Sequence, residues 1–203
     1  MGTQVLLACG MAAGPLFTLA YLLEGAGRPG YKPLRHPVSS LALGPTGWVQ
    51  TVNFVLAGLL SLAFAVGLWH AGPSHWGALL IGVWAAGLLC AGAFRTDPVS
   101  GYPPGTPDQL RHPTRAGTLH DLCSFVGFLA LAAACFVLAP SNSPGWTAYS
   151  IASGALFATT MALAGVAFGQ HPRWVDLGGL IQRVSVTVGW TWQTLLAVHV
   201  LHT

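Results

Sequence analysis

Two ionisable side chains at one junction between apolar segments could carry out acid–base chemistry. Asp97 follows an apolar run that ends near Phe94, and His120 opens the next apolar run. A carboxylate near an imidazole fixes the tautomer of the ring and raises its basicity. Histidine is also the most frequent general base in enzymes. We therefore interpret Asp97 and His120 as a candidate catalytic pair.

These residues, and a third beside them, also have purely structural interpretations. The dipeptide Asp97-Pro98 is a common opening of a turn. Asp121 follows Thr118 at the spacing of a capping box, which predicts that it caps a helix beginning there. A histidine near a membrane interface often does no more than form a local hydrogen bond, so His120 retains that alternative.

Polar side chains elsewhere in the sequence are candidates for substrate binding. Gln50 and Asn53 lie three residues apart on one helical face, where amides in lipid are costly unless they find partners. These two side chains either form hydrogen bonds between helices or contact a substrate. Arginines would bind an anionic head group, and Trp190 with Phe128 would form an apolar floor. The candidate substrate-binding residues are His36, Ser39, Gln50, Asn53, Arg95, Arg115, Ser124, Arg183 and Trp190.

Arg183 stands about one turn inside the last apolar segment. An arginine at that depth snorkels to the interface or pairs with a carboxylate. We expect Asp97 or Asp121 to be its partner, with Glu24 as a weaker third. The pairing would be either a structural clasp between helices or part of a catalytic site.

A divalent metal ion is a weaker alternative for the same group of residues. His36, His112, His120 and Asp97 are of the residue types that bind such ions. No two histidines, however, have the HxxxH or HExxH spacing of a helical metal site. We therefore predict no cofactor and leave the metal ion as an open alternative.

The elements that must position these residues are long apolar segments. Hydrophobic residues make up 53% of the 203 residues and charged residues 6%, whereas about a quarter of an ordinary soluble domain is charged. A helix needs about 20 residues to cross the hydrocarbon core. The sequence therefore predicts a single all-α integral membrane domain over residues 1–203. Its expected helices are about 5–23, 47–69, 76–94, 118–138, 146–168 and 177–201.

The connectors predict that the helices form an antiparallel six-helix bundle. His70–His75 and Ala139–Pro144 are short turns, which force neighbouring helices to run in opposite directions. The eight Lys and Arg and the five Asp and Glu residues fall in Glu24–Arg35, Arg95–Asp121 and Arg173–Arg183. In such a bundle these three segments meet at one face, so the candidate site is expected there.

The excess of Lys and Arg at this face predicts its orientation. Positively charged connectors usually stay in the cytoplasm, so we expect both termini outside a multi-pass protein of the inner (plasma) membrane. The expected partners are membrane lipid and a lipid-like substrate. The sequence contains no basic run of the kind that binds nucleic acid, and it leaves the oligomeric state open.

Motifs spread over most of the chain resemble those of a known family. They are His36-Pro37-Val38-Ser39, Leu41, Gly47-Trp48, Gln50, Phe94, Asp97-Pro98, Gly101-Tyr102-Pro103, His120 and Gln182-Arg183. In order and spacing, from about residue 10 to 195, they resemble the bacterial and archaeal membrane family named domain of unknown function 998. That family is similar to the eukaryotic FRAG, DRAM and SFK membrane proteins. The resemblance implies a six-helix integral membrane protein and no established reaction.

A more distant likeness is to membrane hydrolases such as the alkaline ceramidases. Those enzymes combine Ser, Asp and His at one membrane face, as Ser39, Asp97 and His120 would do here. The paired histidines of their last helix are missing, because His199 and His202 are three residues apart and at the opposite face. This departure puts zinc-dependent hydrolysis in doubt.

Three functional hypotheses follow from the sequence. The leading one is a membrane enzyme that acts on an amphipathic, lipid or isoprenoid-like substrate by acid–base chemistry. The second is a non-catalytic membrane scaffold or regulator whose polar face is a docking surface. The third is a pathway for a small solute or protons, which is weakened because such pathways need ionisable residues at mid-membrane.

Overall fold

Six membrane-length helices make up most of the computed structural model, which describes residues 2–140 and 143–202. They are α1 (Thr3–Gly27), α2 (Trp48–Ala71), α3 (His75–Ala93), α4 (Arg115–Val137), α5 (Pro144–Phe168) and α6 (Gly178–His202). Each is long and apolar enough to cross a bilayer, and the described residues contain no β-strand. The all-α, six-helix prediction is confirmed, and the chain is a multi-pass integral membrane protein. The described residues do not include the predicted ends of the domain, which are residues 1 and 203. They also do not include residues 141–142 of the second predicted short turn.

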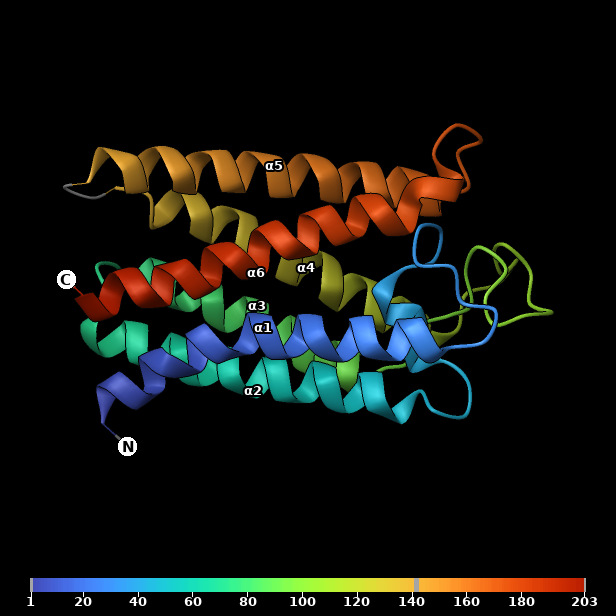
Figure 1. The fold of residues 1–203 in the computed structure, drawn as a ribbon, viewed down its shortest axis with the longest axis horizontal. Helices are drawn as coiled ribbons and strands as arrows, with labels where there is room; N and C mark the ends of the chain where they lie inside the picture. Colours follow the sequence, from blue (N-terminus) through green and yellow to red (C-terminus); the bar gives the residue numbers. More distant parts are fainter. Residues whose placement is uncertain (1, 141–142, 203) are drawn as a thin grey trace.

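The two ends of the bundle differ in their connections and in their charge. Both termini lie at one end, and the three long connectors lie at the other (Figure 1). These connectors are residues 28–47, which contain the 3₁₀ turn η1 (Val38–Ala42), residues 94–114, and residues 169–177 with the turn η2 (Val175–Leu177). Every Asp, Glu, Lys and Arg lies in a connector or in the helical turns beside it. We call this the connector end.

Small residues allow the helices to pack closely. A Cβ atom on Gly87 of α3 would lie 2.9 Å from the backbone oxygen of Cys123 in α4, so only glycine permits this contact. Polar side chains also link helices in the membrane interior: Trp84 Nε1 donates to Gln193 Oε1 (3.1 Å), and Gln193 Nε2 donates to Ser61 Oγ (3.2 Å). Close contact and buried hydrogen bonds both hold helices together where lipid surrounds them.

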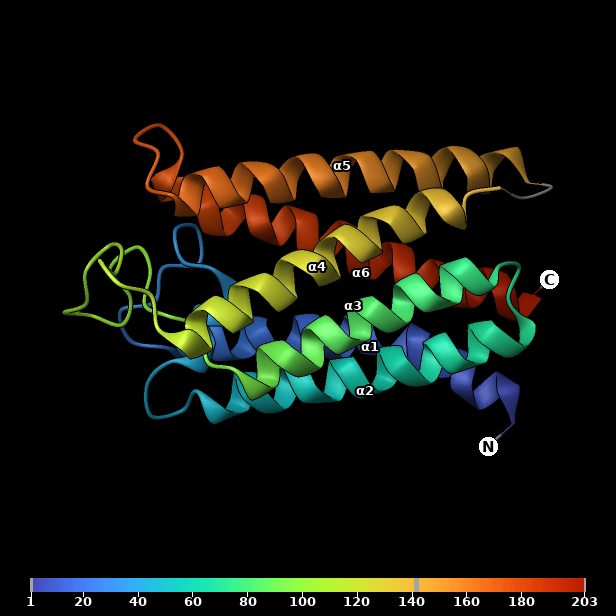
Figure 2. The ribbon, with the colours of Figure 1, turned by 180° about the vertical axis from the view of Figure 1, so that it is seen from behind.

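Helix α4 packs tightly against α5 at the end near the termini only. There, Ser150 Oγ donates to the carbonyl oxygen of Cys135 (3.0 Å) and accepts from Trp192 Nε1 of α6 (2.6 Å). Towards the connector end, α4 diverges from α5 and stays beside α3 (Figure 2). The divergence separates α4 from the α5–α6 pair at the end of the bundle that carries the charge.

Candidate functional site

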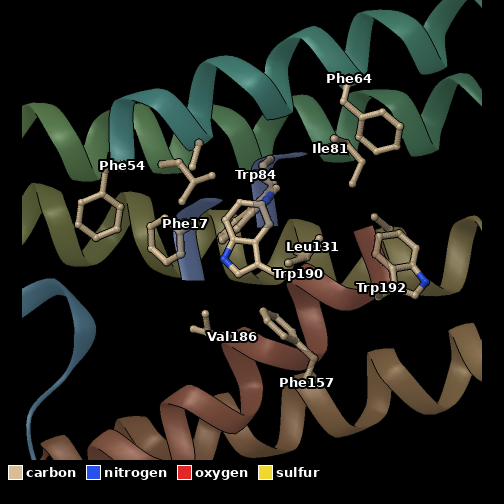
Figure 3. Packing of buried hydrophobic residues seen from close by; sticks show 14 of the residues in the cluster. Phe17, Phe54, Phe64, Ile81, Trp84, Leu131, Phe157, Val186, Trp190 and Trp192 are labelled. Carbon is tan, nitrogen blue, oxygen red and sulfur yellow. The ribbon is translucent and has the colours of Figure 1, made fainter. Parts of the chain in front are cut away.

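A cavity of about 550 Å³ lies where α4 diverges from α5 and α6. Its deep part is aromatic: the ring centroids of Trp84 and Trp190 are 5.3 Å apart, and Phe17 lies 5.3 Å from Trp190 (Figure 3). Phe128 and Phe157 complete this apolar floor. The volume is in the range of sites that enclose small organic ligands.

The opposite part of the cavity is polar and lies at the connector end. Side chains from two connectors and from α4 and α6 contribute to it. They are Ser39, Thr96, Asp97, Gln109, His120, Asp121, Ser124 and Gln182. The cavity is therefore amphipathic along its length, with ionisable groups at one end and aromatic rings at the other.

His120 is held by one hydrogen bond at the polar part of the cavity. It is buried, with 3% of its surface exposed, and its Nδ1 lies 2.9 Å from the carbonyl oxygen of Phe94 at the end of α3. A carbonyl oxygen only accepts, so Nδ1 carries a proton, and a neutral ring in this tautomer has its lone pair on Nε2. Nε2 has no hydrogen bond to any residue that the structure describes. The ring thus offers an unpaired acceptor within a cavity-lining residue.

Asp97 holds the start of α4 and does not pair with His120. Its carboxylate accepts hydrogen bonds from the backbone N–H (2.8 Å) and the hydroxyl (2.7 Å) of Thr114. Thr114 Oγ1 in turn accepts from the N–H of Gly117 (2.9 Å) and is the N-cap of the helix. The prediction of a helix start at Thr118 was therefore wrong, because a carboxylate from the preceding connector stabilises an earlier start.

The arginines predicted to bind an anionic head group lie outside the cavity. Arg183 Nη1 donates to the carbonyl oxygens of Pro33, His36 (3.1 Å) and Gly179 (2.9 Å), and Nη2 donates to Tyr31 Oη (2.5 Å). The expected pairing of Arg183 with Asp97, Asp121 or Glu24 was wrong, because carbonyl oxygens satisfy the guanidinium group instead. Arg95 and Arg115 are exposed at the surface.

His36 is buried in the connectors and does not line the cavity. The N–H of Lys32 donates to its Nδ1 (2.9 Å), so Nε2 carries the proton and donates to the carbonyl oxygen of Ser100 (3.2 Å). Burial lowers the pKa of His36; the carbonyl of Ser100 opposes this effect, and the nearby charges of Arg35 and Lys32 add to it. His36 therefore ties one connector to the next.

Gln50 and Asn53 are also buried away from the cavity. Asn53 Nδ2 donates to the carbonyl oxygen of Phe17 in α1 (3.1 Å) and to Gln50 Oε1 (3.3 Å). Of the two alternatives for this pair, the geometry fits the hydrogen bond between helices. Ser39, Ser124 and Trp190, in contrast, line the cavity as expected.

Several residues of the cavity were not predicted from the sequence. In the sequence, Gln182 was noted only as part of a family motif. In the structure it lines the cavity, and its Oε1 accepts a hydrogen bond from the N–H of Val38 (2.8 Å). Asp121 was considered as a cap or as a partner of Arg183. An amide or a carboxylate within an otherwise apolar helix is the signal that could have identified both.

The cavity reaches the molecular surface between α4 and α5. Phe125 of α4 lines it and is 60% exposed. Gly165 of α5 also lines it and is exposed, and a Cβ added there would meet no atom within 4 Å. This opening faces the side of the bundle, where lipid would surround the helices.

The residues suggested for a metal ion are not gathered together. Within residues 2–140 and 143–202, the structure contains no group of three or more His, Cys, Asp or Glu residues that could hold a metal ion. His36 and His120 bind different carbonyl oxygens, and His112 is exposed in a connector.

Comparison with known proteins places most of the chain within one family model. The model of a family described as "Protein of unknown function (DUF998)" matches residues 11–199. No curated protein and no solved structure matches the chain. The likeness to the FRAG, DRAM and SFK proteins stays a prediction.

Proposed function

The chain belongs to the DUF998 family of uncharacterised membrane proteins, and we propose that it binds an amphipathic, lipid-like molecule and acts on it by acid–base chemistry at His120. The observation that carries this proposal is the cavity itself. Its polar part gathers His120 with two carboxylates, and its deep part is a set of aromatic rings. A ligand with a polar head and an apolar chain would match both parts.

The opening between α4 and α5 supports access from the bilayer. A lipid chain would enter past Phe125 and Gly165 without leaving the hydrocarbon core, and its head would stay near the connector end. Because all Lys and Arg residues are at this end, the positive-inside rule would make it cytoplasmic and the substrate a molecule of the cytoplasmic leaflet. Both termini would then lie outside an inner (plasma) membrane.

His120 would act as the general base. Its Nε2 would accept a proton from a head group that lies within hydrogen-bond reach, about 3 Å. The bond from Nδ1 to the carbonyl of Phe94 fixes the tautomer that this step needs. Asp97 would be a positioning residue, since its contacts hold the first turn of the helix that carries His120.

A comparison of cellular lipids tests the catalytic part. Membranes from cells expressing wild-type protein, His120→Asn or His112→Asn would be extracted and their lipids measured by mass spectrometry. Asparagine retains an N–H donor for the Phe94 carbonyl but has no basic nitrogen, and His112 is an exposed control. We expect expression of wild type and of His112→Asn to change the level of the same lipid, and expression of His120→Asn to leave that level unchanged. Identical lipids in all three preparations would contradict an enzymatic role.

The scaffold hypothesis also has an observation in its favour. Arg35 pairs with Asp108 (2.9 Å) and Asp176 (2.5 Å), which joins all three connectors into one surface. A surface formed by all three connectors would suit the docking of a partner protein. Under this hypothesis, substitutions at His120 would change stability alone and leave the cellular lipids unaltered.

A further inference from the structure

We propose that the head group accepted by this cavity is a protonated amine, so that the ligand is a long-chain amine. This inference rests on the proposed function, because it concerns the same cavity. It reverses the expectation, drawn from the sequence, that arginines hold an anionic head group. Three features of the polar part support it.

The first feature is the charge of the lining. The ionisable residues that line the cavity are Asp97, His120 and Asp121, and no Lys or Arg lines it among the described residues. The well-buried guanidinium groups are occupied elsewhere: that of Arg28 binds Glu24 and the carbonyl oxygens of Leu41 and Leu43 (2.8 and 2.7 Å). An anionic head group would therefore enter a site that contains carboxylates and no cation to pair with it.

The second feature is the start of α4, which is the other place where an anion could bind. Backbone N–H groups at a helix N-terminus attract phosphates and carboxylates. Here Asp97 already occupies that position, since it accepts from Thr114 and its Oδ2 would lie 2.2 Å from a Cβ added to Gly117. A phosphate or carboxylate head group would have to displace it.

The third feature is an excess of unpaired acceptors. His120 is more than nine-tenths buried, and its Nε2 has no hydrogen bond to the described residues. Asp121 lines the same part of the cavity and makes no hydrogen bond or ion pair with the part of the chain that the structure describes. An ammonium group has three N–H donors and no acceptor, so it complements such a site.

Competition binding tests this inference. Full-length protein in phosphatidylcholine nanodiscs at pH 7 would bind tritiated hexadecylamine, and unlabelled hexadecylamine, hexadecanol or hexadecyl phosphate would compete. The three compounds share one tail, and the amine is protonated because alkyl ammonium groups resemble lysine, with a pKa of about 10.4. We expect the amine to bind about tenfold more tightly than the alcohol, since a charge-assisted hydrogen bond is stronger than a neutral one. The phosphate should be the weakest competitor.

Two carboxylate variants identify the source of the preference. Asp121→Asn should weaken amine binding about five-fold and leave alcohol binding unchanged, as for a partly exposed ion pair. Asp176→Asn is the control, because Asp176 is also exposed but lies outside the cavity. Equal competition by amine and phosphate, or unaltered amine binding in Asp121→Asn, would overturn the inference.

A third variant separates this inference from the proposed function. Gly165→Phe would fill the side opening, whereas Ala162→Phe on the same helix adds the same side chain at an exposed position outside the cavity. Suppose that Gly165→Phe abolishes binding of all three compounds, but that amine and phosphate compete equally in wild type. The cavity would then be supported as the binding site, and the preference for an amine would be contradicted. If neither phenylalanine variant affects binding, the proposed function falls as well.

Discussion

Two buried histidines at the connector end occupy very different surroundings. His36 and His120 are each 3% exposed. The backbone groups of Lys32 and Ser100 satisfy both ring nitrogens of His36, whereas the carbonyl oxygen of Phe94 satisfies one nitrogen of His120. The two histidines are therefore equally buried and differ in the number of ring nitrogens that have a hydrogen-bond partner.

The regions around the two histidines differ in the same way. Near His36, Tyr31 Oη donates to the carbonyl oxygen of Pro37 (3.0 Å) and accepts from Arg183. Burial raises the pKa of Tyr31 to about 12, although the charge of Arg183 opposes the shift. Near His120, the cavity leaves Asp121 without a hydrogen bond from the described residues. The first region is a connected structural network, and the second retains binding capacity.

The largest expected effect compares substitutions of the two histidines. His36→Ala leaves two buried backbone groups unsatisfied, which should lower the free energy of unfolding by about 2–4 kcal/mol. His120→Asn keeps the donor to Phe94 and should lower it by less than about 1 kcal/mol. Denaturant titration of both variants in mixed micelles measures this difference. Equal losses would contradict the distinction between the two regions.

The pH dependence of stability sharpens the comparison. The pKa of His36 is lowered in the folded protein, whereas an unfolded histidine has a pKa of about 6.5. Above that pH, His36 is neutral in both the folded and the unfolded protein, and its full contribution to stability is present. As the pH falls, the unfolded state gains a proton first, so stability should decrease by up to about 1.4 kcal/mol per pH unit until the folded pKa is reached.

The measurement is thermal unfolding between about pH 7.5 and pH 5. His36→Gln should flatten the curve relative to wild type, and His112→Gln, at an exposed site, should not. Parallel curves for wild type and His36→Gln would show that His36 does not titrate as described.

The smallest expected effect concerns the positioning of α4. Asp97→Asn removes the negative charge of the carboxylate, whose two oxygens accept hydrogen bonds from Thr114. We expect the free energy of unfolding to fall by about 1 kcal/mol, as for other helix caps. Asp108→Asn changes an exposed carboxylate in the same connector and should cost less than about 0.5 kcal/mol. Chemical denaturation compares the two, and a similar small loss in both would rule out the capping role.

Most of the fold could be predicted because lipid imposes a simple rule on the sequence. Each spanning segment must satisfy its own backbone and remain apolar for its whole length, and all six helices follow that pattern. The start of α4 was misplaced because the carboxylate that stabilises it comes from Asp97, 17 residues before Thr114. Local capping rules cannot include a partner of this kind.

The site was predictable in part for a related reason. Charge asymmetry predicted the end of the bundle at which the polar part of the cavity lies, and Asp97, His120 and Ser124 all line the cavity. The orientation of Arg183 and His36 depended on carbonyl oxygens of the connectors. Those carbonyls carry no sequence signature, so the sequence alone could not show that Arg183 and His36 bind them.

In the proposed function, a lipid-like molecule enters the cavity from the side of the bundle. Quenching of tryptophan fluorescence by tail-brominated hexadecanol tests it directly, because Trp84 and Trp190 form the cavity floor. We predict saturable quenching in wild type and in Ala162→Phe, and little in Gly165→Phe. Equal quenching in all three proteins, or none in wild type, would contradict entry of the ligand through this opening.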